Sequence, residues 1–158
     1  MKQDKFLTGI LIGIGALVLL ALGLFFMRQD SKREYVADST PEGVVHNYIL
    51  AVLNKDYQKA YGYLAELEHK PTYEEFRRAF LNGEVNPDNQ AVDIGASEIV
   101  GEVATVELEL IYASSDPFST GYRNMFTADL VRQNGAWKLT LMPQYNFWGY
   151  NWYVEPPK

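Results

Sequence analysis

Two histidines and a group of tyrosines are the side chains of this chain best suited to acid–base chemistry. His46 lies at the edge of an apolar helix stripe, where an imidazole could face a pocket and exchange a proton near neutral pH. A half-buried structural histidine is the simpler alternative. His69 lies near a predicted helix end, where a cation is favourable to the helix dipole. These two histidines, in a chain without cysteine, do not form a recognisable zinc site.

Aromatic residues form the second group of candidates, because an apolar ring with a polar tip can orient a small apolar ligand. The same chemistry suits the wide end of an ordinary core, so both alternatives stay open. Six of the eleven residues from Gln144 to Val154 are aromatic. We therefore expect a pocket or interaction surface built from a subset of nine residues: His46, Tyr48, Tyr61, Tyr112, Trp137, Tyr145, Phe147, Trp148 and Trp152.

Carboxylates are the remaining candidates for a catalytic base, which would have to face a pocket and be tuned by burial. Four of them fall on the polar side of alternating segments, and we expect these to face solvent: Asp93, Glu107, Glu109 and Asp129. Two carboxylates without a third ligand hold divalent cations weakly. No phosphate-binding loop or nucleophile motif is present. We assign no catalytic residue, metal site or cofactor.

The elements that would position these side chains begin with three short amphipathic helices between Pro41 and Leu81. Thr40 can cap the first and is followed by Pro41, which suits the first helical position. Asp56 can cap the second. Thr72 and Glu75 fit a capping box for the third, and Asn82-Gly83 supplies its end.

The period of the pattern then changes from about 3.6 to 2, which predicts strands. Asn134-Gly135 predicts a tight hairpin turn before the last strand. The residues expected on the inner face are Val92, Ile94, Ala96, Val106, Leu108, Leu110, Tyr112, Phe126, Ala128, Leu130, Trp137, Leu139 and Leu141. Helices followed by an antiparallel meander predict an α+β domain, with three helices packed on a curved antiparallel sheet of about four strands.

An uncharged stretch of 22 residues, Phe6–Met27, precedes this domain. As a helix it would be about 33 Å long, enough for a hydrocarbon core of about 30 Å. A secretory signal peptide is the alternative, but its apolar region is usually shorter and ends at a cleavage site. We expect a membrane anchor bounded by Phe6 and Phe26, in which Gly9 and Gly13 permit close helix contact.

Charge restricts the partners of the segment that follows. Residues 35–158 contain nine Lys and Arg against 17 Asp and Glu, a net charge of −8. Such a domain is repelled by phosphate backbones, so a nucleic-acid partner is not expected. Positive charges flank the apolar stretch on both sides, so they do not indicate which end of the anchor faces the cytoplasm. A very short N-terminal tail before a whole domain favours a signal anchor, with the domain outside the plasma membrane.

The helix join "NKDYQKAY" and the hairpin "NGAWKL" are similar to those of the nuclear transport factor 2-like superfamily, in particular to small lumazine-binding-like, membrane-anchored domains of unknown role. The resemblance covers about residues 40–143 and implies a cone-shaped α+β fold. The superfamily includes isomerases, dehydratases and ligand binders, so the fold does not choose an activity. In its isomerases, a carboxylate base works inside the cone.

The expected organisation is therefore an N-terminal tail (1–5), a transmembrane helix (6–27), a linker (28–40), the α+β domain (41–143) and an aromatic C-terminal flap (144–158). The flap would fold over the sheet or the mouth of the cone; an exposed recognition patch is the alternative. We expect a non-catalytic binding domain of the cell envelope that engages a protein partner or a small apolar ligand. An isomerase- or dehydratase-like enzyme with a pocket in the cone is the alternative.

Overall fold

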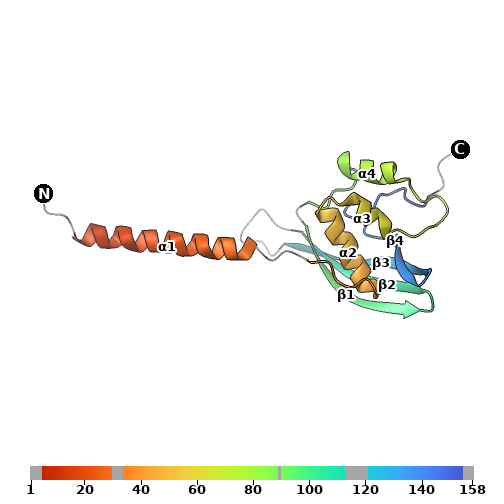
Figure 1. Cartoon of the computed structure of the whole chain (residues 1–158), viewed down its shortest axis with the longest axis horizontal. Helices are drawn as coiled ribbons and strands as arrows, with labels where there is room; N and C mark the ends of the chain where they lie inside the picture. Colours follow the sequence, from red (N-terminus) through yellow and green to blue (C-terminus); the bar gives the residue numbers. More distant parts are fainter. Residues whose placement is uncertain (1–4, 30–33, 89, 113–120, 155–158) are drawn as a thin grey trace. The chain divides into compact units, whose positions relative to one another are not determined.

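The computed structural model describes residues 5–29, 34–88, 90–112 and 121–154, and the chain forms two compact units, Met1–Glu34 and Tyr35–Lys158. The first unit contains α1, Lys5–Gln29 (red in Figure 1), whose side chains are described for residues 8–24. Large apolar side chains such as Leu11 and Leu19 are exposed on it. Within the described residues, no helix has the length and apolar character needed to cross a membrane.

Three helices open the second unit, as predicted, and each begins at the predicted cap. The Thr40 hydroxyl accepts from the Gly43 N–H, and the Asp56 carboxylate accepts from the Lys59 N–H. Thr72 and Glu75 form the expected reciprocal capping box. The helices are α2 (Pro41–Leu53), α3 (Tyr57–Gly62) and α4 (Tyr73–Leu81).

Four antiparallel strands follow in the spatial order in which they occur along the chain. Asn134 and Gly135 both have positive φ, 52° and 81°, as a two-residue hairpin turn requires. In its described residues the unit is therefore an α+β domain with three helices and a four-stranded antiparallel sheet (Figure 1). The strands are β1 (Gln90–Val100), β2 (Val103–Tyr112), β3 (Tyr122–Gln133) and β4 (Ala136–Leu141).

Alternation along the strands separates a core face from a polar face. The core face carries Leu108, Leu130 and Leu139, all fully buried, and Trp137, which is nearly so. Asp93, Glu107, Glu109 and Asp129 lie on the opposite face, as predicted, and are exposed or half-buried there.

Two β-bulges displace residues that strict alternation places in the core. The register of β1 shifts between Ile94 and Ser97, so the prediction for Ala96 is wrong and this residue is exposed. In β4 the shift pairs Leu141 with Asp129, an outer-face residue. The inward prediction for Leu141 is therefore wrong, and the next residue, Met142, is buried in its place.

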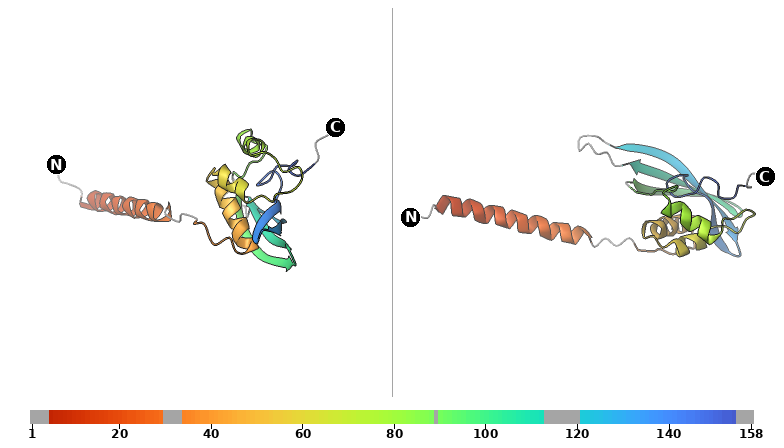
Figure 2. Two further views of the ribbon diagram at one scale, coloured as in Figure 1. Left: turned by 45° about the vertical axis from the view of Figure 1, so that its right-hand side comes forward. Right: turned by 90° about the horizontal axis from the view of Figure 1, so that it is seen from above.

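The helices form successive layers on the core face of the sheet. α2 contacts β1, β2 and β4, α3 packs on α2, and α4 packs on α3 (Figure 2). One buried polar side chain, Asn47, ties α2 to the segment before it: its amide accepts from the Val36 N–H at 2.9 Å and donates to the Val36 carbonyl at 2.8 Å. At the start of α2, the Glu42 carboxylate accepts a hydrogen bond from the Ser97 hydroxyl at the bulge of β1.

This Ser97 hydrogen bond is the main cause that holds the pKa of Glu42 below its usual value. A carboxylate whose pKa is depressed by folding stabilises the fold above its unfolded pKa, and this contribution is lost as pH falls through the folded pKa. We expect Glu42→Gln to lower the free energy of unfolding at neutral pH by less than about 1 kcal/mol, since the group is partly solvated and also lies at a helix N-terminus. The variant should lose less stability than the wild type on acidification below pH 4.5.

Unfolding in urea, followed by tryptophan fluorescence, measures this difference because all three tryptophans lie in the domain. Glu98→Gln is the matched control, since Glu98 is an exposed carboxylate on β1. Parallel stability curves for Glu42→Gln and the wild type across the acid range would contradict the assignment.

Candidate functional site

The C-terminal segment, residues 144–154, fills the space between the sheet and α2. The pocket of the expected cone would lie in this space. Phe147 and Trp148 are buried in the core cluster. The Trp148 ring lies 6.1 Å from that of Tyr48, centroid to centroid, and the Tyr48 hydroxyl donates to the Phe147 carbonyl at 2.5 Å. Among the described residues, Asn47 is the one polar side chain in the buried set, and no carboxylate or imidazole joins it.

Burial keeps the phenols of this region neutral. It raises the pKa of Tyr48 well above the usual value, and it raises the pKa of Tyr153 as well. A neutral phenol can donate a hydrogen bond, and each donates to a backbone carbonyl: Tyr48 to Phe147, and Tyr153 to Ala65 at 2.7 Å. These hydroxyls attach the C-terminal segment to α2 and to the connection between α3 and α4, which is a structural role.

The segment continues from the core to α4. Trp152 packs against Phe76 of α4 with ring centroids 4.6 Å apart, and its edge meets Trp148 at the same distance. Gly149 allows this arrangement, because a Cβ there would lie 2.2 Å from the indole nitrogen of Trp152. The segment therefore joins α2 and α4, two helices that otherwise meet through α3.

A cleft of about 840 Å³ lies between this segment and the α4 region. One wall contains His69, Glu75 and Glu84. The other carries the stacked rings of Tyr145 and Tyr150, with centroids 5.9 Å apart and planes 16° from parallel. These two rings are 62% and 61% exposed, so they are open to a ligand.

Two of the five described non-glycine residues with positive φ line this cleft. His69 and Tyr145, one on each wall, have φ of 61° and 64°, a region that bulky residues rarely adopt. Each such residue costs about 1–3 kcal/mol and persists where its surroundings hold it. Tyr145 is held by two backbone hydrogen bonds, from its N–H to the Trp148 carbonyl and from the Asn86 N–H to its own carbonyl.

The charge of the cleft is predominantly acidic. Its cation, Lys70, is neutralised by Glu66, whose carboxylate lies 2.5 Å from the ammonium nitrogen. Glu75 and Glu84 remain, and the hydrogen bonds that Glu75 accepts from Thr72 lower its pKa and keep it ionised. Exposed tyrosine faces beside carboxylates suit an apolar ligand that carries a positive or donor group.

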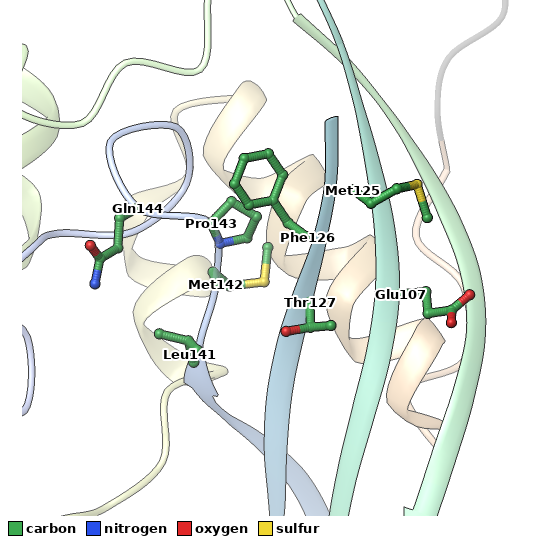
Figure 3. A pocket seen from close by; sticks show the side chains of 8 residues that line it. All are labelled: Glu107, Met125, Phe126, Thr127, Leu141, Met142, Pro143 and Gln144. Carbon is green, nitrogen blue, oxygen red and sulfur yellow. The ribbon is translucent and has the colours of Figure 1, made fainter. Parts of the chain in front are cut away.

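A second, shallower hollow of about 520 Å³ lies where β4 ends (Figure 3). Phe126 points toward Met142 and Pro143, and Glu107 and Met125 lie on the other side of β3. Phe126, predicted to face the core, is 36% exposed because it lies beyond the part of β3 that β4 covers.

The nine predicted site residues do not converge on one pocket. Tyr145 and Trp152 line the cleft, whereas Tyr48, Trp137, Phe147 and Trp148 are core residues. His46 lines a shallow hollow beside Val36 and Gly95. The other two make structural contacts: the Tyr61 hydroxyl donates to the Pro71 carbonyl at 2.8 Å, and the Tyr112 ring packs against Tyr122.

The cleft residues that were not selected from the sequence include Tyr150, Glu75 and Glu84. Glu75 was assigned only as a cap, and no local pattern indicates that α4 lies beside the C-terminal segment. Of the predicted anchor residues, Gly9 and Gly13 lie in α1, and the side chains of Phe6 and Phe26 are outside those described.

No protein-family model matches the chain, and no curated protein does. Solved structures similar to part of it include the following three. A SEC-C motif containing protein from Rhodopseudomonas palustris is 13% identical over 67% of this chain and 79% of its own, with a TM-score of 0.48. A protein from Campylobacter jejuni described as an NTF2-like transpeptidase is 12% identical over 65% of this chain and 99% of its own, with a TM-score of 0.44. A cystatin-fold protein from Novosphingobium aromaticivorans is 9% identical over 67% of this chain and 100% of its own, with a TM-score of 0.43. These values do not assign the chain to a family, so membership of the superfamily named above stays a prediction.

The buried and exposed aromatic residues of the C-terminal segment should differ sharply in their effect on stability. We expect Trp148→Ala to lower the free energy of unfolding by about 3–5 kcal/mol, because it leaves a cavity beside Tyr48. Tyr145→Ala, at an exposed position of the same segment, should change it by about 0.5 kcal/mol or less. Thermal and urea unfolding of the two variants measure the difference. Equal effects would mean that the segment does not complete the core.

Proposed function

We propose that this protein is a membrane-anchored, non-catalytic binding domain that engages a small apolar ligand or a partner side chain in the cleft beside α4. One observation carries the proposal: the Tyr145–Tyr150 pair is exposed on the cleft wall, while the interior is filled by Phe147 and Trp148. Two large rings left in water, held by a strained backbone, are costly for the fold and favourable for a ligand.

The chemistry of the walls favours a ligand with an apolar body and a cationic or hydrogen-bond-donating group. Tyrosine faces attract cations as well as apolar surface. Glu75 and Glu84 add negative charge, and the domain as a whole has a net charge of −8. Aromatic amines and lysine or arginine side chains both meet this description.

The alternative is an isomerase- or dehydratase-like enzyme that uses His46 and tyrosines. The geometry favours binding over this alternative, because the hydroxyls of Tyr48 and Tyr61 donate to backbone carbonyls and His46 lines a different hollow from the tyrosine pair. A base and a polarising donor must lie within hydrogen-bond reach of one substrate.

The membrane anchor is part of the proposal and rests on the sequence. Phe6–Met27 contains no charge, and a helix of this length is about 33 Å long, enough for the hydrocarbon core of a bilayer. The bilayer is then the lipid partner of residues 6–27, and the domain would lie outside the plasma membrane.

Fractionation tests the anchor and its orientation. We expect the full chain to sediment with membranes and to resist alkaline carbonate extraction, whereas a chain beginning at Tyr35 should be extracted. In cells whose outer layers have been removed but whose plasma membrane is intact, added protease should digest the domain, because we expect it to lie outside that membrane. Release of the full chain by carbonate would contradict the anchor, and protection from protease would contradict the orientation.

Fluorine NMR tests the cleft, because the chain contains three tryptophans and Trp152 is the one that lines it. We expect the 5-fluorotryptophan resonance of Trp152 in the detergent-solubilised full chain to shift on addition of aromatic amines such as tryptamine or of an organic extract of membranes. The resonance of Trp137, which lies on β4 and does not line the cleft, should stay in place. Tyr145→Ala combined with Tyr150→Ala should abolish the shift.

Tyr122→Ala is the matched control, since Tyr122 is an exposed tyrosine on β3, outside the cleft. An unmoved Trp152 resonance with every probe would contradict the binding proposal. Conversion of an added compound, seen as new product signals in the proton NMR spectrum, would favour the enzyme alternative instead.

A further inference from the structure

Among the described residues, β4 ends early and leaves seven of the twelve residues of β3 without a neighbour on one side. The pairing between these strands runs from Gln133↔Ala136 to Asp129↔Leu141, and the chain then leaves the sheet at Met142. β3 extends seven residues further, Tyr122–Ala128, paired with β2 alone among the described residues.

Two hydrogen bonds of β3 show to which side its free backbone groups point. The Arg132 N–H donates to Glu102 on the β2 side, and the Asp129 carbonyl accepts from the Thr140 hydroxyl on the β4 side. Peptide groups alternate between the two sides of a strand. Arg123, Met125 and Thr127 therefore present their N–H and C=O groups to the open edge.

Edge strands are ordinarily protected by bulges, charges or a covering element. The opposite edge of this sheet, β1, has all three: a bulge, the charged Asp93 and Glu98, and the Ser97–Glu42 hydrogen bond to α2. The open part of β3 instead exposes Tyr122 and Met125, at 65% and 66%. Its cation, Arg123, is bound to Glu109 at 2.9 Å.

The hollow of Figure 3 adjoins this edge and offers two kinds of contact. On the core side, Phe126, Met142 and Pro143 form an apolar wall. On the outer side lies Glu107, exposed and without an ion pair among the described residues. Since side chains of a strand point alternately to the two faces, an added strand would place every second residue against each wall.

We propose that the open edge of β3 binds an extended segment of a partner protein, added as a fifth strand, in which apolar residues alternate with lysine or arginine. Main-chain hydrogen bonds to Arg123, Met125 and Thr127 supply the pairing, and the two walls select the side chains. The net charge of −8 attracts a basic segment and repels a second copy of the chain. This surface is separate from the cleft, and the inference does not depend on it.

The test uses the full chain in a neutral detergent and a short fluorescent peptide of alternating valine and lysine. Fluorescence anisotropy should show binding that weakens with added salt, and the peptide with glutamate in place of lysine should not bind. Met125→Pro removes an outward N–H without removing a bond to β2, and we expect at least about tenfold weaker binding. Glu107→Gln should weaken binding about threefold. Glu98→Gln, the matched loss of one charge, should have no effect.

Hydrogen exchange on the unmodified chain keeps the test valid if Met125→Pro does not fold. The valine–lysine peptide should protect the amides of Arg123, Met125 and Thr127 and leave those of the cleft unchanged. Absence of binding, binding that Met125→Pro leaves intact in a folded variant, or protection elsewhere would overturn the proposal. Protection of these amides that rises with protein concentration in the absence of peptide would also overturn it, and would assign the edge to a second copy.

Discussion

The structure of this domain depends on the entry of its own C-terminal segment into the space between the sheet and α2. The sheet and α2 pair through apolar faces, but Tyr48 of α2 would bring a phenol into that interior without a partner. Phe147 supplies the partner, and the hydrogen bond between them joins residues 99 positions apart in the chain. Because a buried donor without an acceptor costs about 1–3 kcal/mol, the helix and the segment determine each other's position.

The same constraint explains why β4 is short. To reach α2, the chain has to leave the sheet soon after the hairpin, and it does so through the bulge that turns Leu141 outward and Met142 inward. Pro143 follows and cannot donate to a strand ladder. Among the described residues, β3 is then paired along Tyr122–Ala128 with β2 alone. The filled interior and the open edge are therefore two results of one change in chain direction.

The sequence predicts the elements well where their cause is local. Thr40, Asp56 and the Thr72–Glu75 pair identify the helix starts because capping depends on residues three apart, and Asn134-Gly135 identifies the hairpin because its turn requires positive φ. The bulges are not visible in the same way: Ala96 and Leu141 continue an alternating pattern, and only pairing with the neighbouring strand displaces them. The role of Asn47 depends likewise on Val36, which lies outside its helix.

The candidate site was harder to predict because it joins segments whose contact is set by the core. Six aromatic residues lie in one short stretch, yet Phe147 and Trp148 are buried while Tyr145 and Tyr150 are exposed and stacked on each other. The turn that separates these two pairs requires positive φ at Tyr145 and the absence of a Cβ at Gly149. Composition alone gives all these rings the same preference for burial. The backbone turn decides which rings are buried. It directs Phe147 and Trp148 into the core, and the same turn leaves Tyr145 and Tyr150 exposed at the cleft.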